Sequence, residues 1–410
     1  MTSTRAACQE LDARDPLAHV RERFVLPDGV IYLDGNSLGA LPKAVIERSR
    51  RVVEEEWARG LIRSWNEAGW YTAPARVGAK VARLIGASDD EVVVTDSTSV
   101  DLFKLLTGAL ALRPDRKVIL GLDGDFPTDA YIAQGIATLT GAQFKRASAD
   151  ELTAAIDQNT AVVFLTHVNY KTGFIHDMAR ITDAAHAKGA LALWDLSHSA
   201  GALDVQLNKA NADLAVGCGY KYLNGGPGAP AYVFAAKRHH AAIRHPLTGW
   251  FGHQAPFDFA PDFAPAKGVA KMLTGTPPML SLAALEAALD VYADLDMRQV
   301  RAKAASLTDL FIKLVDDSLM SHGFTLASPR KADERGAQVS LAHEHGYAVV
   351  QALIARGVIG DFRAPDIARF GFVPLYVRHT DVFDAVHIID DVMRTSAWNT
   401  PEFRTRKTVT

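Results

Sequence analysis

Two charged residues of opposite sign each follow an apolar run in the middle of the chain. Asp195 ends the run ALALWD, and Lys221 follows LAVGCGY just before a glycine-rich turn. Charged groups are rarely buried without a partner, so both positions need a chemical reason. Lys221 has three plausible roles: it pairs with a carboxylate, extends to solvent, or forms a Schiff base with an aldehyde. An aspartate and then a lysine at successive strand ends favour the Schiff base, since a pyridine-aldehyde cofactor needs an anion at its ring nitrogen and a lysine at its aldehyde.

Hydroxyl, aromatic and acidic residues follow two earlier apolar runs. Thr98 and Ser99 come after VVVT, where a helix begins. Free backbone N–H groups and the helix dipole attract an anion there, although on their own the two residues are better explained as a helix cap. Phe126 and Asp129 follow KVILGL; the aspartate fits a turn, and Phe126 is either a core residue or a stacking platform for a flat ligand.

Two further polar residues complete the set. Thr166 ends the next apolar run, and His198 follows Asp195 by three positions. Alone, they are best explained as a turn residue and a structural histidine. Taken together, the strand-end residues predict a pyridoxal-phosphate site with an anion-binding helix start, a ring platform, a carboxylate and a Schiff-base lysine. Neither G-x-G-x-x-G after an early strand nor G-x-x-x-x-G-K-[ST] is present, which disfavours a dinucleotide site or a P-loop.

Alternating strands and helices must position these residues. The predicted strands are apolar throughout, so both of their faces should be covered; they lie at residues 92–95, 117–122, 161–168, 190–197, 214–219 and 231–236. Helical patterns separate them, which indicates an α/β domain with a mostly parallel sheet. The last strand follows the previous one after a short turn, so we expect it to run antiparallel.

The chain is expected to divide into three parts. Residues 1–65 form an N-terminal arm with a helix at 43–59, residues 66–280 form the large α/β domain, and residues 281–410 form a smaller α+β domain. In the last part the pattern predicts two long helices, then strands at 338–342, 358–362 and 367–372 and helices at 347–356 and 380–394.

Composition narrows the class of protein. The 410 residues carry a net charge of −3, with 48% hydrophobic residues and two cysteines, Cys8 and Cys218. We find no basic tract for nucleic acid, no membrane span and no apolar signal core, so we expect a cytoplasmic protein. Two cysteines make neither a disulfide framework nor a four-cysteine zinc site, and Cys218 fits a small buried hydrophobe.

The chain resembles the kynureninase family, pyridoxal-phosphate hydrolases of the aminotransferase-like fold type I. The resemblance covers nearly the whole chain and rests on YLDGNSLGALP (32–42), FPTD (126–129), WDLSHSAGA (194–202), GCGYKYLNGGPG (217–228), GWFGH (249–253) and ARFGFVPLY (368–376). It implies a large, mostly parallel sheet of the seven-stranded type with a smaller C-terminal α+β domain. The lysine motif alone is less specific, because related desulfurases and aminotransferases carry a similar lysine after a strand.

The resemblance also implies residue roles. Lys221 forms the Schiff base, Asp195 pairs with the pyridine nitrogen, and Tyr220 is a phosphate ligand or a proton donor. The other cofactor contacts that it implies come from Thr98, Ser99, Phe126, Asp129, Thr166 and His198, with Trp250 and Thr276 contributed by a second subunit. Arg369 holds the substrate α-carboxylate, while Trp65, His253 and Asn36 shape the rest of the substrate pocket.

By this resemblance the protein is a homodimer with shared active sites. It cleaves L-kynurenine, and less well 3-hydroxykynurenine, to anthranilate or 3-hydroxyanthranilate and L-alanine, in tryptophan degradation or NAD biosynthesis. Trp65 and Thr276 resemble the bacterial type, which favours kynurenine, because animal enzymes tend to have histidine and asparagine at these positions.

Three alternatives stay open at this stage. A cysteine desulfurase, or another enzyme of the same class, shares the lysine motif, but such desulfurases carry a histidine before the lysine and need a cysteine on a mobile loop. A non-catalytic protein of the same fold is expected to lose Lys221, Asp195 or Arg369. A metal hydrolase would have to use HEH (343–345) or His239 and His240, which lack a third ligand at useful spacing.

Overall fold

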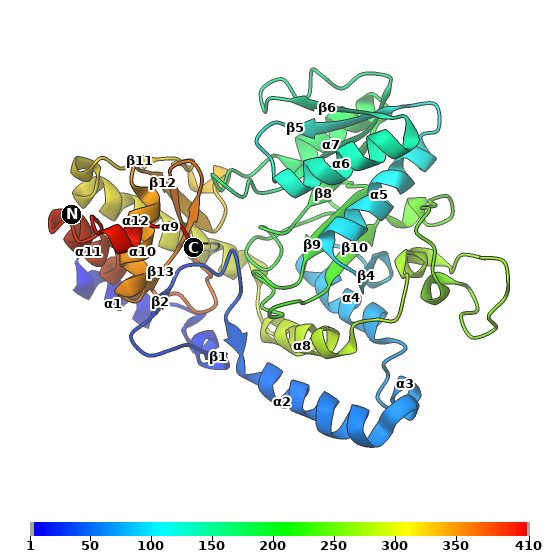
Figure 1. Cartoon of the computed structure of the whole chain (residues 1–410), viewed down its shortest axis with the longest axis horizontal. Coiled ribbons are helices and arrows are strands. Elements are labelled where there is room, and N and C mark those ends of the chain that lie inside the picture. The colour runs from blue at the N-terminus through cyan, green and yellow to red at the C-terminus, as the bar shows by residue number, and fades with distance from the viewer. Residues whose placement is uncertain (1–3, 408–410) are drawn as a thin grey trace.

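A seven-stranded mixed sheet forms the centre of the larger body of the molecule (Figure 1). The computed structural model describes residues 4–407. The strand order is β4-β10-β9-β8-β7-β5-β6, with β10 antiparallel to both of its neighbours and the other pairs parallel. The strands are β4 (Val92–Thr95), β5 (Val118–Leu122), β6 (Gln143–Ala147), β7 (Thr160–Thr166), β8 (Leu191–Asp195), β9 (Leu214–Cys218) and β10 (Ala231–Ala235).

Helices cover both faces of this sheet because its central strands are apolar on both sides. On one face the core includes residues of α5 (Thr98–Leu112) and α6 (Pro127–Thr140). On the other it includes residues of α4 (Ala73–Leu84), α7 (Met178–Ala187) and α8 (Met279–Leu289). This arrangement leaves the carboxyl ends of the parallel strands at one edge, where a ligand can bind.

The smaller body carries a four-stranded antiparallel sheet in the order β11-β12-β15-β14. Both described ends of the chain lie on this body (Figure 1). Its strands are β11 (Thr325–Leu326), β12 (Gln338–Ala342), β14 (Asp361–Arg363) and β15 (Ile367–Gly371). Its helices are α9 (Met297–Ser318), α10 (Gly346–Ala355), α11 (His379–Arg394) and α12 (Pro401–Arg404).

The N-terminal segment packs against this smaller body. Helix α1 (Arg5–Ala13) contacts α11, and β2 (Ile31–Tyr32) pairs in parallel with β13 (Val358–Ile359). Strand β1 (Phe24–Val25), which precedes β2, pairs with β3 (Leu41–Pro42). After β3 the chain continues through α2 (Lys43–Arg51) to α3 (Ser64–Glu67) and the large sheet.

The predicted fold is confirmed, with local differences. The strand predicted at 358–362 is divided into β13 and β14, which belong to different sheets. All six predicted strands of the large sheet are present, and the last runs antiparallel as expected. The sequence pattern missed the edge strand β6, whose residues QFKRA are mostly exposed and carry no apolar run. The predicted helix at 43–59 changes after Arg51 into a π-helical segment, Val52–Gly60. The domain boundaries at residues 65 and 280 stay predictions.

Candidate active site

A cavity of about 310 Å³ opens at the carboxyl edge of the large sheet. Its position follows from strand register, because the last residues of β7 and β8, Thr166 and Asp195, are paired side by side. The residues that line it come from six segments of the chain and are Ser97, Thr98, Ser99, Phe126, Thr128, Asp129, Thr166, Asp195, Ser197, His198, Cys218, Tyr220, Lys221, Ala229 and Ala231. The structure therefore brings together nine of the predicted site residues in one cavity (Thr98, Ser99, Phe126, Asp129, Thr166, Asp195, His198, Tyr220 and Lys221).

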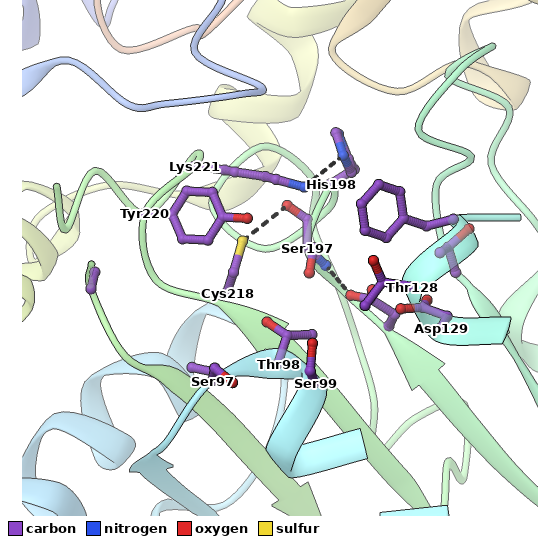
Figure 2. Close-up of a pocket in the computed structure, with 15 residues that line it drawn as sticks. Ser97, Thr98, Ser99, Thr128, Asp129, Ser197, His198, Cys218, Tyr220 and Lys221 are labelled. Carbon is purple, nitrogen blue, oxygen red and sulfur yellow. Dashed lines mark hydrogen bonds between the residues drawn. The ribbon is translucent and has the colours of Figure 1, made fainter. Parts of the chain in front are cut away.

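Lys221 reaches into this cavity from the turn after β9 (Figure 2). Its Nζ atom lies 2.9 Å from Nε2 of His198 and 5.8 Å from the ring centroid of Phe126. Within the part of the chain that the structure describes, it forms no ion pair with a carboxylate, which removes the first of its three alternatives. The backbone is fixed by Gly39, whose N–H donates to the Tyr220 carbonyl at 2.8 Å, and a Cβ atom on Gly39 would lie 2.3 Å from the Lys221 carbonyl.

The start of α5 supplies the anion-binding side of the cavity. Ser97 is the N-cap of this helix, and its Oγ accepts from the Val100 N–H at 3.5 Å. The cap that Thr98 or Ser99 was expected to provide thus lies one residue earlier. Thr98 and Ser99 occupy the first turn, where N–H groups have no partner within the helix and the dipole favours negative charge.

Acidic residues form another side of the cavity. Asp195 is buried, and its Oδ1 accepts from the Ser197 N–H at 2.7 Å. Asp129 is buried beside it; its Oδ2 atom has no hydrogen-bond partner among the described residues, and burial, with the charges of Asp195 and Asp125, raises its pKa well above the usual value. Asp125 holds Thr166 by accepting from its N–H at 2.7 Å and from its hydroxyl.

His198 is a neutral imidazole in this setting. It is buried, and desolvation together with the charge of Lys221 lowers its pKa well below the usual value. A neutral ring can accept from the Lys221 amine through Nε2, and its Nδ1 has no partner among the described residues. The imidazole can thus accept a hydrogen bond from the amine that it contacts.

These features fit pyridoxal phosphate. The helix start suits a phosphate, the half-exposed Phe126 offers a ring face, and beside Lys221 Asp195 supplies a carboxylate and Asp129 an unpartnered oxygen. Such a cofactor would occupy the cavity with its aldehyde toward the lysine. The donor set matches the requirements of that group with no charge left unexplained.

Arg369 does not line the cavity and is almost fully buried. Its Nε donates to Asp361 at 2.8 Å, its Nη1 to the Tyr170 carbonyl at 2.6 Å, and its Nη2 to Ser37 Oγ at 2.8 Å. Tyr170 in turn packs edge-to-face on Phe126, with ring centroids 5.2 Å apart. Arg369 is therefore one side chain away from the ring platform of the cavity.

Five further predicted residues lie elsewhere in the single chain. Trp65 and Trp250 pack edge-to-face, 6.3 Å apart, and line a separate cavity of about 760 Å³ with Ile62, Asn66, Tyr71, Phe257 and Phe259. His253 lines a third cavity next to Trp250, and Thr276 is exposed. Asn36 is fully buried against Gly371 and does not line the Lys221 cavity.

The metal-hydrolase alternative has no support in residues 4–407. No group of three metal-ligating side chains occurs there. His345 instead stacks on Trp398 with ring centroids 4.5 Å apart, and His239 contacts Asp213 at 2.7 Å. These histidines have structural partners.

Four lining residues with a hydroxyl or thiol group were missed by the sequence pattern. Ser97, Thr128 and Ser197 carry hydroxyls whose neighbours had been singled out, and Cys218 was interpreted only as a small buried hydrophobe. Cys218 is buried, yet it borders the cavity, with Sγ 4.0 Å from the Ser197 carbonyl. The alternation of side chains along β9 could have indicated that Cys218 and Tyr220 share a face.

Comparisons with known proteins agree on a family and a fold. Residues 300–389 match the kynureninase C-terminal domain family. The chain is 52% identical over 414 residues to a kynureninase from Burkholderia mallei, covering 99% of this chain and 100% of that protein. It is also 52% identical over 415 residues to a kynureninase from Pseudomonas fluorescens, with 100% of both covered.

Solved structures of lower identity share the fold. An apo cysteine desulfurase from Thermococcus onnurineus matches with a TM-score of 0.78 at 20% identity, covering 96% of this chain and 100% of that one. The cysteine desulfurase CsdA from Escherichia coli gives 0.76 at 21%, covering 92% and 98%. A C-DES variant with glycine covalently linked to its pyridoxal-phosphate cofactor gives 0.77 at 18%, covering 90% and 99%.

Proposed function

This chain belongs to the kynureninase family, and we propose from that premise that the cavity beside Lys221 is its active site. The protein is a pyridoxal-phosphate-dependent hydrolase that cleaves a carbon–carbon bond of L-kynurenine, giving anthranilate and L-alanine. The main support for the site assignment is that Lys221, Asp195 and the start of α5 lie in one cavity at the carboxyl edge of the sheet. The full-length resemblance supports it.

Each cavity residue has a role toward the cofactor that follows from its chemistry. Lys221 would bond to the aldehyde, and Asp195 would hold the ring nitrogen protonated. Thr98 and Ser99, with the free N–H groups of the first helical turn, would bind the phosphate. The remaining contacts to the ring, its substituents and the phosphate would come from Phe126, Asp129, Thr166, His198 and Tyr220.

When bound, pyridoxal phosphate accepts electrons from the substrate α-carbon and thereby makes the Cβ–Cγ bond open to hydrolysis. Lys221 is the group placed to remove and return the proton at the α-carbon, because its amine projects into the cavity. His198, 2.9 Å away, accepts a hydrogen bond from this amine and orients it. Burial raises the pKa of Tyr220, so its phenol stays protonated and can donate a proton to the alanine fragment. One water molecule supplies the oxygen of the anthranilate carboxylate.

The substrate carboxylate is assigned to Arg369. A planar guanidinium recognises a carboxylate through paired N–H donors. Arg369 is held in place by Asp361, Ser37 and Tyr170, which supports a fixed recognition group. Asn36, next to Ser37, would act by shaping this wall.

We propose a homodimer in which each active site uses residues from both subunits. In the single chain, Trp250 and Thr276 lie outside the Lys221 cavity, while the large aromatic side chains of Phe257 and Phe259 are 58% and 75% exposed. The segment that carries them extends away from the sheet (Figure 1). Because Trp65 packs on Trp250 and His253 lies beside it, the neighbour that supplies Trp250 would supply Trp65 and His253 too. An exposed aromatic surface of this kind is typical of a protein interface.

Substrate preference and location follow the same family pattern. Trp65 and Thr276 support a preference for kynurenine over 3-hydroxykynurenine, which places the enzyme in tryptophan degradation or NAD biosynthesis. The two cysteines of the chain are both free, which supports work in the reducing cytoplasm. The described helices include none long and apolar enough to cross a membrane.

The desulfurase alternative conflicts with the thiols. Burial raises the pKa of both Cys8 and Cys218, so neither is a ready thiolate nucleophile. Cys8 lies in α1, on the opposite body from the cavity, and Cys218 is held within β9. The shared fold at about one-fifth identity does not by itself carry the chemistry.

One experiment tests the proposal. The purified protein should be yellow, borohydride should bleach and fix the cofactor on Lys221, and kynurenine should release fluorescent anthranilate. Peptide mapping after reduction identifies the lysine. Cofactor attached to another lysine, or turnover of cysteine without turnover of kynurenine, would overturn the assignment.

A further inference from the structure

We propose that the ion pair of the buried Lys104 with the partly buried Asp96 is a positioning device for the cofactor phosphate, because it ties the turn before α5 to the 272–274 loop. The proposal rests on the active site assigned above. It adds two residues that do not line the cavity and that touch no substrate. Their effect is transmitted through the backbone of the phosphate-binding turn.

Lys104 is completely buried in the second turn of α5. Its ammonium contacts the Asp96 carboxylate, Oδ1 of Asp101 at 3.0 Å and the Met272 carbonyl at 2.7 Å. An ammonium has three N–H donors, and these three acceptors use all of them. Lys104 thus joins the helix, the preceding turn and a loop that lies 168 positions further along the chain.

Asp96 lies directly before the residues that line the anion-binding side. Its φ of 40° is in the left-handed region, which a non-glycine residue adopts only when its surroundings hold it. Its carboxylate accepts from Thr95 Oγ1 at 2.9 Å and Thr274 Oγ1 at 2.6 Å, besides Lys104. Its carbonyl accepts from the N–H of Ala231, which also lines the cavity, at 3.0 Å. Asp96 therefore fixes the path of the chain into Ser97, Thr98 and Ser99.

The same network reaches the aromatic segment. The Thr274 carbonyl accepts from the Phe251 N–H at 3.1 Å, and a Cβ atom on Gly249 would lie 2.3 Å from that carbonyl. Trp250 lies between these two positions. The ion pair therefore holds the phosphate-binding turn and the segment proposed to serve the neighbouring subunit in one fixed arrangement.

The charge states of the acidic residues around Lys104 support an ion pair between Lys104 and Asp96 alone. Burial raises the pKa of Asp101 to about 8, so at neutral pH this group is mostly a protonated acid, while the Lys104 and Thr274 contacts lower the pKa of Asp96. One ammonium then balances one carboxylate. A buried ion pair of this kind is often no more stabilising than a hydrophobic pair of equal volume, so its value here is better sought in geometry.

The test compares two buried lysines. Lys104→Met removes the device, whereas Lys303→Met removes a buried ion pair with Asp15 (2.6 Å) on the smaller body, away from the cavity. Holoenzyme of each is gel-filtered, and cofactor loss is followed by absorbance and by activity regained on adding pyridoxal phosphate. We expect release from Lys104→Met to be about tenfold faster or more, the change that about 1.4 kcal/mol makes, and release from Lys303→Met to match the wild type.

A milder variant keeps the test decisive if Lys104→Met does not fold. Thr274→Val removes only the hydroxyl that bonds Asp96 and should raise the release rate about threefold. Unchanged release from a folded Lys104→Met, or from Thr274→Val where the first is insoluble, would overturn the proposal. So would equal acceleration by Lys303→Met, which would show a general effect of stability. Wild-type protein that binds no cofactor would instead refute the site assignment.

Discussion

The assignment of Arg369 to the substrate carboxylate gives a prediction whose size can be worked from its contacts. Arg369→Lys keeps the charge but removes the planar fork. The guanidinium donates to Asp361, to the Tyr170 carbonyl and to Ser37 Oγ at 2.6–2.8 Å. A lysine ammonium is a point charge on a different stem, and it can recover only part of this set.

Two separate effects should follow. Each hydrogen bond to a charged group contributes about 1.5–3 kcal/mol, so loss of two buried ones lowers the free energy of unfolding by roughly 3–6 kcal/mol. Loss of the paired contact to the substrate costs about 1.4–3 kcal/mol more in the transition-state complex, or roughly 10–100-fold in kcat/KM. Urea unfolding of the holoenzyme measures the first effect, and anthranilate fluorescence measures the second.

Arg363 provides the matched control. It also contacts Asp361, with Nη2 2.7 Å from Oδ2, but its side chain is 37% exposed. Arg363→Lys should lower stability by less than about 1 kcal/mol, as expected for a partly exposed pair, and leave kcat/KM within about twofold. The reasoning fails if Arg369→Lys loses stability yet keeps kcat/KM, because Arg369 would then be purely structural. It also fails if Arg363→Lys alone loses kcat/KM, which would move carboxylate recognition to that residue.

Three further outcomes are expected. Lys221→Ala should abolish the absorbance band of the lysine-bound cofactor. It should also lower kcat by about four orders of magnitude or more, as loss of a central proton-transfer group does. Full turnover in this variant would refute the role of Lys221. Trp65→His introduces the residue of the animal type. It should shift the ratio of the kcat/KM values for the two substrates toward 3-hydroxykynurenine by roughly tenfold. An unchanged ratio would contradict the substrate-pocket assignment. Burial lowers the pKa of both His167 and His176 to about 4, so unfolded chains take up protons from about pH 6.5 downward before the folded protein does. Stability should fall between pH 6.5 and 4 by up to roughly 3 kcal/mol for each histidine, and His176→Gln should flatten the thermal-melting profile in that window; a parallel profile would show that other groups dominate.

Much of the fold was predictable because its core strands are apolar on both faces. Runs such as AVVFLTHV have no alternation to misread, and strand ends are marked by the first polar residues. Strand β6 was missed because it lacks such an apolar run. Its residues QFKRA lie at the edge of the sheet, where solvent covers one side and apolar side chains are not required. The π-helical turn of Val52–Gly60 was also out of reach, since no helical periodicity in the sequence encodes a local change of hydrogen-bond pattern.

The cavity residues could be predicted where a charged or polar side chain follows a strand. They were harder to predict where contacts between distant segments position the side chain. Asp195 and Lys221 have no simple structural explanation in their apolar runs, so each pointed to a partner. Asp125, by contrast, fits an ordinary turn, and only the structure shows it holding Thr166. Lys104 and Asp96 are 8 positions apart at the start of one helix, and their pair also contacts a loop far along the chain. A local sequence pattern cannot predict a contact with so distant a loop.

Two layers of residues surround the cofactor cavity, and different structural elements position them. The inner layer sits on strand ends and one helix start, whose geometry is fixed by the sheet, so Lys221, Asp195 and Thr98 are placed within a single chain. The outer layer consists of loops with exposed aromatic side chains, and Trp65 and Trp250 meet each other but not the cavity. In the proposed homodimer, cofactor binding should therefore depend mainly on one subunit and substrate recognition on two. The Lys104–Asp96 pair lies where these layers meet, since it contacts both the phosphate-binding turn and the loop that supports Trp250.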